Sequence, residues 1–145
     1  MLKTHFAELF EVALSGIIPY ARLAQIAGAS AMTVPDTLDA FAVYVAQAYA
    51  EEKMSFEAAD AVMNAAFGVA VSQEFSAEHD TARFPAKMYE VYQAFDAGED
   101  AHLGDDESID PELKYTQPLI QRFLSTHTHL VACVAPPRAH SPEIE

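Results

Sequence analysis

Apolar residues recur at every third or fourth position along most of this chain, and that spacing constrains the fold more than any other feature. Residues 2–15 carry apolar side chains at positions 2, 6, 9, 10, 13 and 14, with Glu8 and Glu11 on the opposite side. This pattern is typical of an amphipathic α-helix that packs one face against a core. No segment of useful length alternates between apolar and polar residues, so the sequence predicts no β-sheet.

Residues that start and stop helices divide the chain into five to six predicted helices. Ser55 is the expected N-cap of a helix at 56–75, whose apolar positions cover more than half of its surface. We therefore expect this helix to be the most buried one. Its polar stripe of Glu57, Asp60 and Asn64 is interpreted as a solvent edge or as a capping partner for a neighbouring turn. The other predicted helices lie at 2–15, 20–27, 35–52 and 84–98, and after Asp110–Pro111 in a last helix that Pro118 kinks or divides.

Length and composition agree with this pattern. A chain of 145 residues is one domain by size, and a hydrophobic fraction of 51% is ordinary for a folded protein. Alanine is abundant and there are only five glycines, which favours helix. The predicted fold class is all-α, a single-domain bundle over residues 1–134 with a flexible C-terminal tail at 135–145.

The stretch 95–112 concentrates negative charge. It holds eight of the twenty-two acidic residues, and no Lys or Arg occurs between Lys87 and Lys114. The whole chain has a net charge of −14, which repels nucleic-acid backbones and anionic membrane surfaces and attracts basic proteins. No apolar run is long enough to span a membrane, so we expect a cytoplasmic protein that binds neither nucleic acid nor membrane.

Aromatic residues flank this acidic stretch, and together they predict a surface for a basic protein partner. Tyrosine side chains commonly anchor protein interfaces, and acidic side chains steer a basic partner toward them. In size, charge and helicity the chain is similar to small acidic inhibitors such as bacterial toxin-immunity proteins, with which it shares no motif. The predicted partner-binding residues are Tyr89, Asp96, Glu99, Asp100, Asp105, Asp106 and Tyr115.

A metal site in the same stretch is the first alternative. In the register of an EF-hand, Asp96 would be position 1, Asp100 position 5 and Glu107 position 12, but Gly98 and Ala101 occupy positions where that motif needs a ligand and a glycine. A looser site, in a metal-binding protein or a metal-dependent enzyme, would use other combinations of side chains. Its candidate ligands are Asp96, Asp100, His102 and Asp105.

A DNA-binding motif is the second alternative. Residues 23–34, LAQIAGASAMTV, resemble the helix-turn-helix of lactose-repressor-type regulators, and the resemblance implies DNA binding through residues 20–34. The next residues depart from that pattern. Pro35 would interrupt the recognition helix, and Asp36 and Asp39 stand where a helix that reads a DNA groove needs basic or amide side chains.

No catalytic signature accompanies these candidates. The sequence contains no G-x-S-x-G elbow and no glycine-rich phosphate loop. The lone Cys133 lies between Val131–Ala132 and Val134, a setting that makes a thiol inert, and it excludes an internal disulfide. We therefore expect a protein-binding module without a cofactor rather than an enzyme.

Overall fold

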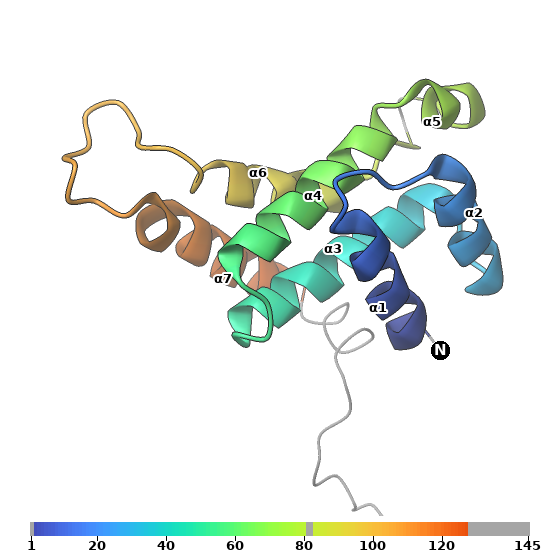
Figure 1. Ribbon diagram of the computed structural model, residues 1–145, viewed down its shortest axis with the longest axis horizontal. Coiled ribbons are helices and arrows are strands. Elements are labelled where there is room, and N and C mark those ends of the chain that lie inside the picture. The colour runs from blue at the N-terminus through green and yellow to red at the C-terminus, as the bar shows by residue number, and fades with distance from the viewer. Residues whose placement is uncertain (1, 81–82, 128–145) are drawn as a thin grey trace, which may run out of the picture.

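The computed structural model describes residues 2–80 and 83–127. Within these ranges the chain forms seven α-helices, one π-helical turn and no β-strand, so the all-α fold is confirmed (Figure 1). Seven helices exceed the predicted five to six. In chain order the elements are α1 (Leu2–Ala13), α2 (Tyr20–Ala29), α3 (Val34–Ala50), α4 (Phe56–Ala70), α5 (Gln73–Glu78), α6 (Ala86–Asp96), η2 (Glu112–Thr116) and α7 (Gln117–Thr126).

Helix α3 lies at the centre of the bundle and packs on α2, α4, α6 and α7. Ten of its 17 residues are buried, against seven of 15 in α4. The expectation that 56–75 is the most buried helix is therefore wrong. Helix α4 keeps a solvent-facing side that includes Glu57, Asn64 and Gly68, whereas α3 meets neighbours on several sides.

The predicted helix at 56–75 is two helices. Helix α4 ends at Ala70, and Ser72 starts α5 by accepting a hydrogen bond from the N–H of Phe75 at 3.2 Å. The Ser72 hydroxyl also donates to the carbonyl of Val69 at 2.7 Å. A serine side chain that bonds to nearby backbone groups competes with helix continuation, which explains the break.

The last helical segment changes from a π-helical turn to an α-helix just before Pro118. The expected start is confirmed, since the Asp110 carboxylate accepts a hydrogen bond from the N–H of Glu112 at 3.0 Å. The backbone then widens into the π-helical turn η2, in which Gln117 donates to the carbonyl of Glu112, five residues earlier. Because proline cannot donate a backbone hydrogen bond, the wider turn just before Pro118 lets α7 continue behind it.

The segment that resembles a helix-turn-helix has a structural role. Helix α3 begins at Val34, so Pro35 lies in its first turn and does not interrupt it. Val34, Pro35 and Leu38 are buried, and the Asp39 carboxylate accepts a hydrogen bond from the N–H of Met88 at 2.8 Å. The first turns of α3 are thus buried against the rest of the protein, whereas a DNA-recognition helix has to expose its first turns. The geometry gives no support to the DNA-binding alternative.

None of the helices in the described residues combines the length and apolarity that a bilayer crossing needs. The tail predicted at 135–145 lies outside the described residues, as does Cys133.

Candidate functional site

The acidic stretch forms a long loop, residues 97–111, that connects α6 to η2. Figure 1 shows this loop projecting at the end of the molecule opposite α2 and α5. At its base, Gly98 lies so close to η2 that a Cβ on it would overlap the Thr116 hydroxyl and lie 3.2 Å from the Cα of Glu112. The buried Thr116 hydroxyl donates to the carbonyl of Ala94 at 2.7 Å. These contacts hold the two ends of the loop together.

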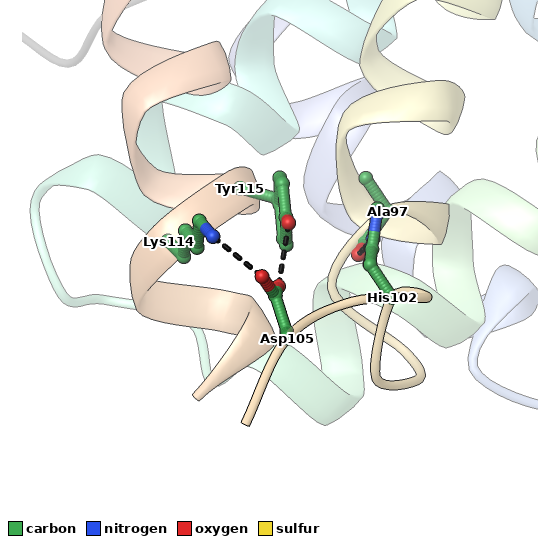
Figure 2. Close-up of polar contacts among 5 residues, drawn as sticks. All are labelled: Ala97, His102, Asp105, Lys114 and Tyr115. Atoms are coloured by element: carbon green, nitrogen blue, oxygen red, sulfur yellow. Dashed lines mark hydrogen bonds and ion pairs between the residues drawn. The ribbon is translucent and has the colours of Figure 1, made fainter. Parts of the chain in front are cut away.

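Asp105 anchors the far part of the loop to η2. Its two carboxylate oxygens accept hydrogen bonds from the Lys114 ammonium at 2.6 Å and from the Tyr115 hydroxyl at 2.5 Å (Figure 2). The hydrogen bond from Lys114, followed by that from Tyr115, lowers the pKa of Asp105 below its ordinary value. The carboxylate is therefore charged at neutral pH and already has a cation of its own.

His102 also contacts Tyr115, through the face of the tyrosine ring. Its imidazole stacks on Tyr115, with ring centroids 3.7 Å apart and planes inclined by 13°. Its Nε2 is 2.7 Å from the carbonyl oxygen of Ala97, to which the ring donates (Figure 2). We call His102, Asp105, Lys114 and Tyr115 the Asp105 cluster. Through this cluster, two side chains of the loop hold it against η2.

Between the two loop members of this cluster the chain makes a tight turn. The N–H of Asp105 donates to the carbonyl of His102 at 3.0 Å, and Gly104 adopts a φ of +92°, which a glycine tolerates without strain. Leu103, at the tip of the turn, is fully exposed. The turn therefore projects an apolar side chain from an acidic loop.

A second set of carboxyl groups lies where α6 enters the loop. The Asp60 side chain on α4 forms a hydrogen bond with Glu99, and Asp96 lies near enough to act on it electrostatically. Burial, then the bond and the charge of Glu99, then the charge of Asp96 raise the pKa of Asp60 to about 7. We call Asp60, Asp96 and Glu99 the Asp60 cluster. At neutral pH Asp60 is therefore partly protonated.

Aromatic rings extend from this second cluster along α6. The rings of Phe67 and Tyr92 are stacked at 4.3 Å, and Tyr89 continues the stack at 6.0 Å from Tyr92. Burial and then the charges of Asp96 and Glu99 raise the pKa of Tyr92. Tyr89 is 38% exposed, so the stack ends at the surface with an accessible tyrosine face.

The predicted partner-binding residues therefore separate into two groups. Asp96, Glu99 and Tyr89 lie on the side of α4 and α6, whereas Asp105 and Tyr115 bond to each other within the Asp105 cluster. The remaining two acids, Asp100 and Asp106, are exposed on the loop.

The four predicted metal ligands do not form one site, although His102 and Asp105 both contact Tyr115. The Asp105 carboxylate is held by Lys114 and Tyr115, and the Nε2 of His102 is held by the carbonyl of Ala97. Among the residues that the structure describes, no group of three or more His, Cys, Asp or Glu side chains is arranged to hold a metal ion. The geometry therefore does not support a metal site formed by Asp96, Asp100, His102 and Asp105.

Sequence reasoning missed two members of the site. The sequence places Asp60 on the solvent edge of its helix or makes it a capping partner for a neighbouring turn, whereas its contact with Glu99 depends on how α4 packs against α6. Lys114 was noted only as the end of a stretch without cations. Lys114 is the first Lys or Arg after Asp105, nine residues further along a chain that is poor in basic residues. This position favours the ion pair between Lys114 and Asp105.

Comparisons of this chain with protein-family models, with curated proteins and with solved structures each gave no match.

Proposed function

We propose that this protein binds a basic protein partner through the surface formed by the Asp60 cluster and the exposed face of Tyr89. The observation that carries the proposal is the convergence of three acidic side chains from α4, α6 and the loop without a cation among them. In the part of the chain that the structure describes, no ion pair includes Asp60, Asp96 or Glu99. A Lys or Arg side chain from a partner would relieve their mutual repulsion.

The surroundings of this surface suit a protein rather than a small cation. Tyr92 lies next to the acids, and Tyr89 continues its stack as a flat, partly exposed ring. Aromatic rings near charged groups are typical of the energetically important centre of an interface. The exposed Asp100 and Asp106 extend the negative charge along the loop. With a net charge of −14, the whole chain would accelerate the approach of a basic partner.

Inhibition of a basic protein is one form that this function would take. Covering a positively charged site needs no catalytic group of its own, which agrees with a sequence that contains no catalytic signature. In this reading the acidic surface guides association and Tyr89 slows dissociation.

The test measures association rates with a partner captured by the immobilised full-length chain and identified by mass spectrometry. The triple variant D96N/E99Q/D100N should associate about tenfold more slowly at low salt. The control variant E11Q/E74Q/E78Q makes the same change of net charge at exposed positions on α1 and α5, and should slow association much less. Association that is indifferent to ionic strength, or equal slowing by both variants, would contradict the proposal.

A further inference from the structure

A cavity of about 720 Å³ lies beside η2 and is lined by Glu112 of that turn. Its walls come from the end of α3, the connection 51–55, the start of α4, and the η2–α7 segment. Pockets of several hundred Å³ that combine apolar walls with a few polar groups are typical of small-molecule sites. We call this cavity the Glu112 pocket.

Glu112 supplies the charged group of the pocket. Its Oε2 accepts a hydrogen bond from the Tyr49 hydroxyl at 2.5 Å. Burial, followed by the bond with Glu112, raises the pKa of the nearly buried Tyr49, so its phenol stays protonated and keeps donating. The Tyr49 hydroxyl thus orients the carboxylate of Glu112.

The carboxylate has no cation of its own. In the described ranges no ion pair involves Glu112, and Lys53, which also lines the pocket, pairs with Glu51 at 2.9 Å. Glu52 adds a second acid to the lining, and it occupies this position with a φ of +60°, a left-handed conformation that costs a non-glycine residue about 1 kcal/mol. The pocket is therefore suited to a positive charge.

The rest of the lining is apolar or neutral. Met54, Phe56 and Ile120 provide apolar surface, and Gln121 adds an amide. An inorganic cation would leave these apolar walls without a partner, and an anion would be repelled by Glu112. A ligand with a flat cationic head and an apolar body would use both kinds of wall.

We propose that the Glu112 pocket binds an organic cation of the amidine or guanidinium class, whose head bonds to Glu112 and whose body contacts Met54, Phe56 and Ile120. Planar amidinium and guanidinium groups match the two oxygens of a carboxylate. Such a group occurs on free small molecules and on the arginine side chains of proteins. This pocket is separate from the Asp60 cluster, so the inference does not depend on the proposed function.

The test titrates the full chain with benzamidine and with benzamide, its uncharged isostere, by calorimetry. Benzamidine should bind and benzamide should bind at least about tenfold more weakly, because only the former makes a charge-assisted hydrogen bond. Glu112→Gln should weaken benzamidine binding about tenfold, whereas Glu107→Gln, which removes an exposed loop acid outside the pocket, should leave it unchanged. An unchanged melting temperature in Glu112→Gln would show that the fold is intact.

A parallel titration with N-acetyl-arginine amide distinguishes the two sources of the cation. Tighter binding than benzamidine assigns the pocket to an arginine side chain of a partner, and weaker binding assigns it to a free ligand. No benzamidine binding at millimolar concentration, equal binding of benzamide, or undiminished binding by Glu112→Gln would each overturn the inference. The triple variant D96N/E99Q/D100N should bind benzamidine like the wild type, which separates this result from the test of the proposed function.

Discussion

Asp105 and Asp60 both lie in the acidic region of the molecule, yet their surroundings shift their pKa values in opposite directions. Asp105 accepts hydrogen bonds from Lys114 and Tyr115, and its pKa is lowered. Asp60 shares a hydrogen bond with Glu99 near Asp96, and its pKa is raised to about 7. The first carboxylate stabilises the loop that carries it. The second is held among like charges, so it is the better candidate for contact with a partner.

The comparison shows that the amount of negative charge in a segment does not identify its binding residues. Asp105 lies inside the acidic stretch 95–112, whereas Asp60 lies outside it, on α4. The difference comes from a single lysine, since Lys114 reaches Asp105 and no Lys or Arg pairs with Asp60 in the described residues. Three experiments, each with a companion variant, would test this difference, beginning with the largest expected effect.

The largest effect is expected from Gly98→Ala, because Gly98 lies between the two clusters. The new methyl group would overlap the Thr116 hydroxyl and press against the Cα of Glu112. We expect a loss of about 2–3 kcal/mol in the free energy of unfolding, measured by urea denaturation, since neither contact can yield without moving η2. The variant should also have looser contacts within the Asp105 cluster and within the Asp60 cluster.

Gly68→Ala is the matched control for this substitution. Gly68 lies in α4, and nothing would come within 4 Å of a Cβ placed there. This variant should gain about 0.5–1 kcal/mol, because alanine is the better helix former. An equal response of the two variants would mean that the close approach at Gly98 has no energetic role.

The second effect is expected from Asp60→Asn, and it should depend on pH. Because the folded-state pKa is raised, the folded chain binds more protons than the unfolded chain between about pH 4 and pH 7, so wild-type stability falls across this window. The asparagine side chain of the variant does not ionise. The variant should match the wild type near pH 4 and be about 1–2 kcal/mol more stable above pH 7, allowing for solvent screening of a part-exposed group.

Asp96→Asn is a useful companion, because the charge of Asp96 is the smallest of the causes that raise the pKa of Asp60. It should show the same sign with a smaller gain. A destabilised Asp60→Asn at pH 8 would indicate that the Asp60 carboxylate has a cation and would remove the contrast with Asp105.

The smallest effect on global stability is expected from Asp105→Asn, whose cationic partner Lys114 is 47% exposed. The change should appear in the loop itself, as faster hydrogen exchange of amides 102–109. The pKa of Asp105 is lower in the folded chain than in the unfolded chain. The stabilisation that its carboxylate contributes is therefore fully present above the unfolded-state pKa, and it is lost as the pH falls through the folded-state pKa. Tyr115→Phe keeps the lysine bond and the stack on His102, so its exchange should change less.

Much of the fold could be predicted from the sequence, because helix periodicity and capping are local. Ser55 accepts a hydrogen bond from the N–H of Ala58 at 3.1 Å, as its position predicted. The break at Ser72 was missed, since apolar spacing continues through it and only the serine side chain marks the end of α4. The burial of α3 was also missed, because it depends on which helices surround it.

The candidate site was less predictable for the same reason. Contacts such as Asp60 with Glu99 or Tyr49 with Glu112 join residues far apart in the chain. Local patterns fix which helices exist, but not which faces of them meet. The acidic loop could be located from composition alone, whereas the division of its acids into a cation-paired group and an unpaired one required the packing of η2 against α6.

The π-helical turn η2 contains, in effect, one residue more than an α-helix of the same rise. Removing one residue from 112–116 would restore the regular i→i+4 winding, and the segments before and after the turn would keep nearly the same rotational phase, because the wide turn absorbs the extra residue. The side chains of the turn itself would be redistributed around the helix axis, so Tyr115 and Glu112 would not both keep their present partners, Asp105 and Tyr49. A single-codon deletion would thus disturb the loop cluster or the pocket while leaving every helix able to form. In this segment the number of residues matters as much as their chemistry.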